Sequence, residues 1–161
     1  RLAHPMPPVL IALFAALMLL PACGEDTGDL QQTHAYMDSL RLYLGDLRLM
    51  DHQLAKIVES DTVSADLIIP VIAESLRPKV EELRQRADVL QPTPLVHNVH
   101  TLLLSYLDTR LQAYDAALLG QAEARPELFE LFAHKQFEAQ QIGESLEDEA
   151  QRLRSQVAEY R

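Results

Sequence analysis

The stretch PLVHNVHTLLLSYLDTRLQAYDAALL, residues 94–119, is the part of the chain whose pattern most directly decides the fold. Its apolar positions recur every three or four residues, at Leu104, Leu107, Leu111, Tyr114 and Leu118. Residues at this spacing share one face of an α-helix, so the stretch predicts one amphipathic helix. Thr93 before it is a suitable N-cap residue, and Pro94 suits the first helical position.

Three further segments show the same spacing, at residues 29–60, 69–90 and 125–161. In the first, the apolar positions are Leu30, Met37, Leu40, Leu44, Leu47, Leu54 and Val58. In the second they are Ile69, Ile72, Leu76, Val80, Leu83, Ala87 and Leu90. In the last they are Leu128, Leu131, Phe132, Ala139, Ile142, Leu146, Ala150, Leu153 and Val157. No stretch alternates with a period of two, so the sequence predicts an all-α fold.

Short connections separate the four predicted helices, and a short connection brings the next helix straight back along the previous one. We therefore expect an antiparallel up-down-up-down four-helix bundle. In this topology the starts of the first and third helices lie at one end of the bundle, together with the ends of the second and fourth.

Two prolines interrupt the second segment. Inside a helix, Pro70 and Pro78 would each remove a backbone hydrogen bond and clash with the preceding turn. The segment is therefore expected to be kinked, or split near Arg77; in one arrangement Pro70 lies in the first turn and Pro78 opens a second helix. Gly120 is expected to be the C-cap of the third helix, unless residues 121–123 extend that helix by a turn.

An apolar leader precedes the predicted bundle. Residues 9–20, VLIALFAALMLL, are twelve consecutive apolar residues. A helix of that length spans about 18 Å, well short of the hydrocarbon core of a bilayer, which is about 30 Å thick. The run has the size of the apolar region of a secretory signal peptide, and the small residues that follow suit cleavage.

The four residues Leu20-Pro21-Ala22-Cys23 resemble the lipobox of bacterial lipoproteins. The resemblance implies that the chain is cut before Cys23 and that Cys23 then carries a covalent lipid. Because Gly24 rather than an aspartate follows Cys23, it also implies the periplasmic face of the outer membrane in a Gram-negative host. The resemblance divides the chain into a signal peptide (residues 1–22), an acylated tether (23–28) and a four-helix bundle domain (29–161).

Charge and cysteine content limit the partners. The formal net charge is −10 at pH 7, and removal of Arg1 with the leader makes it −11. Such a charge opposes binding to nucleic-acid phosphates and to anionic headgroups, so a nucleic-acid partner is not expected and membrane attachment is expected from the lipid. Cys23 is the only cysteine, which excludes an intramolecular disulfide and a thiolate metal cluster.

Histidines are the first candidates for a binding site. His97 and His100 are neighbours on one helix face, and the topology puts His34 at the same end of the bundle, with Asp148 and Glu149 at a similar level. Imidazoles and carboxylates are ligands for zinc, copper or nickel, so a membrane-proximal metal site is one hypothesis. The alternative is that these histidines simply cover the solvated end of the core.

A second candidate cluster lies toward the other end of the predicted bundle. His52 and His134 are each eight residues from a helix end there, and Asp51 and Glu130 lie close to them in sequence. The alternative is that the imidazoles lie on the surface. Asp51 itself falls on the apolar stripe of the first helix, either buried or at the edge of that stripe.

The sequence contains no catalytic arrangement that we recognise. The serines have no nucleophile-elbow glycines, and no glycine-rich loop could hold phosphate. We therefore expect a non-enzymatic, lipid-anchored envelope protein that contacts another envelope protein, as an accessory subunit, adaptor or inhibitor. The competing hypothesis is a small periplasmic carrier or sensor that binds metal or haem through the bundle histidines.

Overall fold

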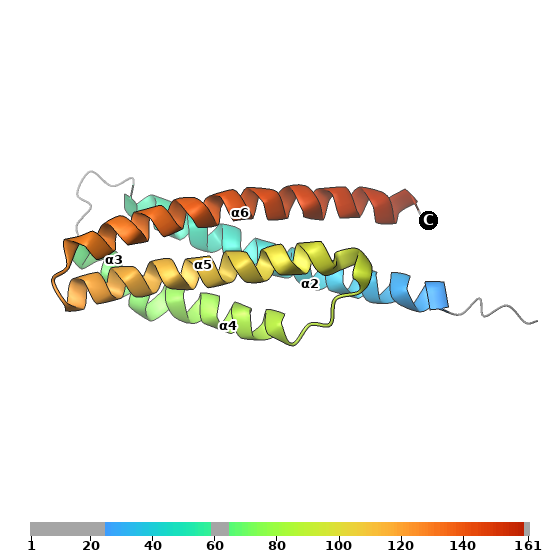
Figure 1. The fold of residues 1–161 in the computed structure, drawn as a ribbon, viewed down its shortest axis with the longest axis horizontal. Helices are drawn as coiled ribbons and strands as arrows, with labels where there is room; N and C mark the ends of the chain where they lie inside the picture. The colour runs from blue at the N-terminus through green and yellow to red at the C-terminus, as the bar shows by residue number, and fades with distance from the viewer. Residues whose placement is uncertain (1–24, 59–64, 160–161) are drawn as a thin grey trace, which may run out of the picture.

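The structure, a computed structural model, describes residues 25–58 and 65–159 (Figure 1). The leader, Cys23 and the first residues of the predicted tether lie outside these ranges. Within them the chain is helical apart from turns and short connections, and no strand is present. The predicted all-α class is confirmed.

Four helical segments make up the described chain, as the sequence predicts. They are α2 (Glu25–Val58); α3 (Ala65–Val71), the π-helical turn η2 (Ile72–Leu76) and α4 (Arg77–Asp88) in one continuous run; the 3₁₀ turn η3 (Pro94–Val96) with α5 (His97–Ala122); and α6 (Pro126–Glu159). Helix α2 starts at Glu25, so residues 25–28 of the predicted tether are helical.

The long helices lie side by side, and α5 packs against both α4 and α6 (Figure 1). Two ion pairs join α4 to α5, Arg77–Asp115 and Arg84–Asp108, each with an N–O distance of 2.6 Å. Between α5 and α6, the Asn98 amide donates a hydrogen bond of 3.0 Å to Glu149. The start of α2 and the end of α6 lie at the same end of the molecule (Figure 1).

Helix α5 is buried on several sides rather than along one stripe. Leu107 and Tyr114 are buried as predicted, whereas the predicted positions Leu104, Leu111 and Leu118 are only partly buried. The stripe was predicted from one periodic face, but α5 contacts three neighbouring segments. Further core positions on this helix therefore lie outside the predicted stripe, at Val99, Leu103, Ala113 and Ala117.

The second segment stays one run of helix despite its two prolines. Pro78 is the second residue of α4, and the π-helical turn η2 comes directly before it. A π-helical turn is wider than an α-helical one and so relieves the clash between a proline ring and the preceding carbonyl groups. Pro70 lies inside α3 rather than in a first turn. The predicted apolar positions from Ile72 to Ala87 are fully buried.

The turn from α5 to α6 differs from the predicted glycine cap. Helix α5 continues past Gly120 to Ala122, which is the extension left open by the sequence. Gly120 is needed instead for close packing, because a Cβ atom there would lie 3.1 Å from the Cβ of Leu128. The left-handed residue is Ala124, with φ 53°, and the Arg125 amide donates a hydrogen bond of 2.9 Å to the Gly120 carbonyl. These are features of a Schellman turn.

We expect Ala124→Gly to raise the free energy of unfolding by about 1 kcal/mol, because glycine adopts the left-handed conformation without the steric cost that alanine has there. Chemical denaturation followed by circular dichroism measures this change. The matched control is Ala122→Gly, two residues earlier inside α5, which should instead lose about 0.5–1 kcal/mol. A loss of stability in both variants would contradict the assigned turn.

Candidate functional site

A buried arginine joins three helices. The Arg110 side chain, on α5, is only 8% exposed. Its Nε donates a hydrogen bond of 3.0 Å to the Tyr106 hydroxyl, one helical turn earlier. Its two terminal nitrogens donate to a carboxylate oxygen of Asp51 on α2 and to the amide oxygen of Gln136 on α6. We call these four residues the Arg110 cluster.

Asp51 lies at the border between the core and solvent. Its side chain is 47% exposed, so the structure places it at the edge of the apolar stripe. Its second carboxylate oxygen accepts a hydrogen bond of 3.3 Å from the Tyr106 hydroxyl. One carboxylate therefore accepts hydrogen bonds from both the guanidinium and the phenol, which keeps the buried charge of Arg110 paired.

Burial changes the protonation behaviour of the tyrosines around Arg110. Loss of solvent raises the pKa of Tyr106 to about 12, although the nearby guanidinium acts in the opposite direction. Burial likewise raises the pKa of Tyr114. Both phenols are therefore neutral at physiological pH, and the Tyr106 hydroxyl keeps the proton that it donates to Asp51.

A pocket of about 200 Å³ opens beside the cluster, between α2, α5 and α6. Arg110, Tyr106 and Asp51 form one wall, and the other lining residues come from α2 and α6. Gly143 on α6 allows the Tyr106 ring to pack there, since a Cβ at this position would lie 3.0 Å from the ring carbon Cε2. An ion pair of 3.0 Å between Arg48 and Glu147 also borders the pocket.

The sequence indicated Asp51 but not Arg110. Arg110 lies three residues after Leu107 and four before Tyr114, so it has the spacing of the predicted apolar stripe. The sequence did contain a signal for this pair. A basic residue, Arg110, lies on the apolar stripe of one predicted helix, and an acidic residue, Asp51, lies on the apolar stripe of another. The register that brings Asp51 and Arg110 together is a tertiary property, which the sequence pattern does not supply.

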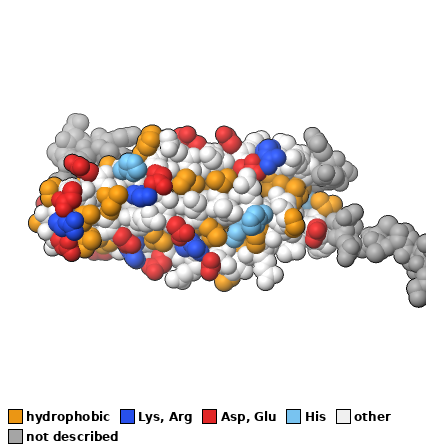
Figure 2. Space-filling model, viewed as in Figure 1, with side chains coloured by type: hydrophobic (Ala, Val, Ile, Leu, Met, Phe, Trp, Pro, Cys, Tyr) orange, Lys and Arg blue, Asp and Glu red, His pale blue; other side chains and the backbone are white. Residues whose placement is uncertain are grey.

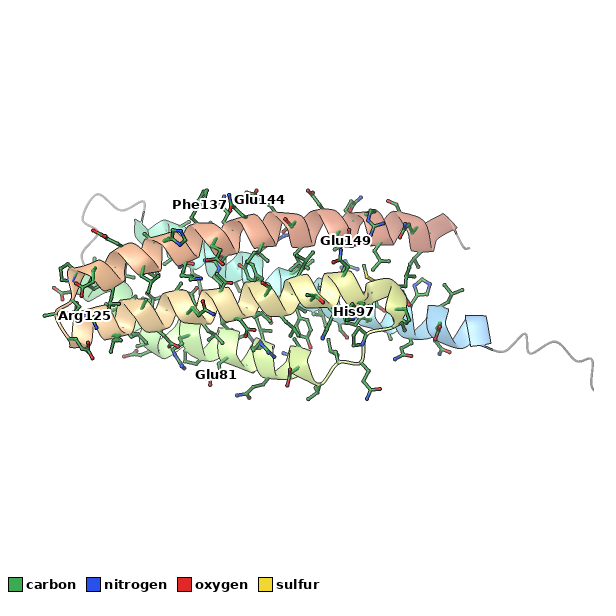
Figure 3. All side chains as sticks on the ribbon, viewed as in Figure 1. Glu81, His97, Arg125, Phe137, Glu144 and Glu149 are labelled. Atoms are coloured by element: carbon green, nitrogen blue, oxygen red, sulfur yellow. The ribbon has the colours of Figure 1, made fainter. Side chains whose placement is uncertain are left out.

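The three histidines of the predicted metal site have different environments. His100 is buried, and its Nδ1 lies 3.1 Å from the Tyr36 hydroxyl on α2. His97 is exposed (Figure 3), while His34 borders a groove that Arg154 of α6 also lines. Across the described ranges, no group of three or more histidine, cysteine, aspartate and glutamate side chains is arranged to hold a metal ion. A metal at His34, His97 and His100 stays a prediction.

The second predicted cluster is not assembled around its histidines. Asp51 bonds to Arg110 and Tyr106 of α5. His52, Glu130 and His134 are all exposed, on α2 and α6. The surface position of the imidazoles agrees with the alternative that the sequence left open.

His100 is held in an environment that favours its neutral form. Burial lowers the pKa of His100, and the nearby His97 and Arg84 act in the same direction, while Asp88 opposes them. The Tyr36 and His100 rings also meet edge to face, with centroids 5.8 Å apart. Next to them, the Thr33 and Thr93 hydroxyls are hydrogen-bonded at 2.9 Å.

The outer side of α2 carries exposed leucines. Leu42 is 66% exposed and Leu49 is 58% exposed. Residues seven apart lie on the same side of a helix, and Gly45 lies between them with nothing near the position of its missing Cβ. We call Leu42, Gly45 and Leu49 the α2 outer face. On the face of the molecule drawn in Figure 2, acidic and basic side chains are interspersed with apolar ones.

Comparison of the chain with known protein families finds no match, and comparisons with curated proteins and with solved structures find none either. Among the described helices, none is both long enough and apolar enough to cross a membrane. Cys23, the predicted lipid attachment site, lies outside the described residues.

We expect Asp51→Ala to lower the free energy of unfolding by about 1–3 kcal/mol, because it leaves the buried Arg110 without its anionic partner. In an Arg110→Met background the same change should cost much less, since no buried charge remains to be paired. Urea denaturation of the four proteins of this double-mutant cycle measures the coupling. Equal losses in both backgrounds would mean that the pair does not stabilise the fold.

We expect the stability of the protein to fall as the pH is lowered through about 6.5, the pKa of histidine in an unfolded chain. The unfolded chain protonates His100 at a higher pH than the folded chain does, so protonation favours unfolding until the pH is below the folded pKa. Urea denaturation across this range measures the effect, which should be smaller in His100→Gln. His134→Gln, at an exposed position, should behave like the parent.

Proposed function

We propose that this chain is a lipid-anchored bacterial envelope protein, without enzymatic activity, that acts through contact with another envelope protein. A lipid on Cys23 would hold it at the membrane, on the periplasmic face of the outer membrane in a Gram-negative host. In that position it would serve as an accessory subunit, adaptor or inhibitor.

We propose that the body of the protein is an antiparallel up-down-up-down bundle. The order of the contacting residues supports this topology. From Arg77 to Arg84 on α4 the partner on α5 moves back from Asp115 to Asp108. From Asn98 to Arg110 on α5 the partner on α6 moves back from Glu149 to Gln136. Such a body presents long helix faces, which suits a role in binding.

The α2 outer face is the observation that carries the proposal of protein contact. Exposed side chains of Leu42 and Leu49 on one helix face offer apolar area that another protein can cover, and Gly45 between them lets a partner backbone come close. The Arg110 cluster supports the same proposal in another way. Its polar groups are bonded mainly to one another, so it holds α2 in place beneath this face.

The proposal is tested by site-specific cross-linking in the cell envelope. A photo-reactive amino acid at Leu42 should give one defined adduct with another envelope protein. The matched control is Val89, at the end of α4, which is 78% exposed and should give no such adduct. Leu49→Asp should abolish the adduct at position 42 without unfolding the protein, because Leu49 is exposed.

Membrane fractionation of a Cys23→Ala variant tests the anchor. The variant should stay folded and leave the membrane fraction, because the lipid supplies membrane affinity and no part of the core. Retention of the variant in the membrane fraction would contradict the lipid anchor. Equal adducts at Leu42 and Val89 would contradict a contact through the α2 outer face.

A further inference from the structure

The pocket beside the Arg110 cluster carries one negative charge in excess. Five charged side chains line it, and four of them form two ion pairs, Arg110–Asp51 and Arg48–Glu147. The fifth is Glu144 on α6. Its carboxylate accepts a hydrogen bond of 3.2 Å from the Gln140 amide and, among the described residues, forms no ion pair.

Part of the pocket is apolar. Leu44 and Leu47 of α2 and Leu146 of α6 line it. The volume of about 200 Å³ is enough for several water molecules or for a small organic ligand. Water against these leucines has no hydrogen-bond partner on their side, so a ligand with a short hydrocarbon chain would gain free energy by displacing it.

An exposed aromatic side chain lies seven residues before Glu144 on α6, outside the pocket lining. Phe137 is exposed and projects from the same side of α6 as Glu144, away from α5 (Figure 3). Gln140 lies between them in sequence and lines the pocket. The α6 side of the pocket thus presents a carboxylate and an amide, and the leucines supply its apolar lining.

We propose that this pocket is a binding site for a small organic cation, namely a primary ammonium group on a short hydrocarbon chain. The three N–H donors of the ammonium group match the Glu144 carboxylate and the amide oxygen of Gln140, whose nitrogen already donates to that carboxylate. The hydrocarbon chain covers Leu44, Leu47 and Leu146.

An organic anion fits the same pocket less well. Arg110 and Arg48 are each already paired with a carboxylate, Asp51 and Glu147, so an incoming carboxylate would add a further negative charge beside these two anions. It would also meet the excess charge of Glu144. The net charge of −10 on the whole chain attracts cations and repels anions in addition. This site is separate from the protein contact proposed above and does not depend on it.

Calorimetric titration of the full chain, held in a non-ionic detergent, tests the proposal. The probe is n-butylammonium chloride. The two control ligands have the same number of carbon atoms: sodium butyrate supplies an anion, and n-butanol is neutral. We expect n-butylammonium to bind with a dissociation constant of about 1 mM or below, and the other two to bind at least about tenfold more weakly. Absence of n-butylammonium binding at several millimolar, or equal binding of all three probes, would overturn the proposal.

Two variants locate the binding. Glu144→Gln should weaken n-butylammonium binding at least about tenfold, because the ammonium group loses its charged acceptor. Asp148→Asn removes the same charge from the next turn of α6, outside the pocket lining, and should leave binding within about twofold. Both residues are exposed, so neither change should disturb folding. Equal affinities in the two variants would show a general charge effect and overturn the site.

Discussion

The hydrogen bonds and the ion pair of one buried guanidinium are the interactions on which the rest of this structure depends. Arg110 gives up most of its hydration, and this cost is offset only if its donors and its charge find partners inside the protein. The partners come from α2, from α6 and from α5 itself. Apolar side chains would tolerate a small slide of α2 along α5, but the ion pair with Asp51 favours one register. The Arg110 cluster therefore favours one packing arrangement of α2 against α5 and α6.

Helix α2 depends on such polar contacts more than the other helices do. The backbones of α5 and α6 approach closely over much of their length, whereas α2 stands farther from its neighbours and reaches them with long side chains. Three polar contacts join α2 to α5 and to the residue before η3, at three levels of the bundle. They are Thr33–Thr93, Tyr36–His100 and Asp51–Arg110. The larger distance between α2 and its neighbours also leaves room for the pocket beside Arg110. The pocket and the dependence of α2 on polar contacts therefore have the same structural origin.

Periodicity predicted the helices well because burial of an apolar face is a local property of the sequence. The positions from Ile72 to Ala87 are buried as predicted, and α6 begins at the predicted proline, Pro126. Whether the second segment would be kinked or split depended on whether its backbone could widen before Pro78. The pattern of apolar residues does not predict such a widening. The Asp51–Arg110 pair depended on the register of two distant helices, so the sequence could indicate one partner but not the pair.

The widened turn at η2 also sets the rotational phase of the second segment. Ile72, Leu76 and Val80 follow one another at intervals of four, and a regular α-helix would carry such a series gradually away from the core. A π-helical turn takes up more than four residues, so it cancels much of that drift and all three side chains stay buried. The turn thus accommodates Pro78 and keeps the side chains before and after it in line.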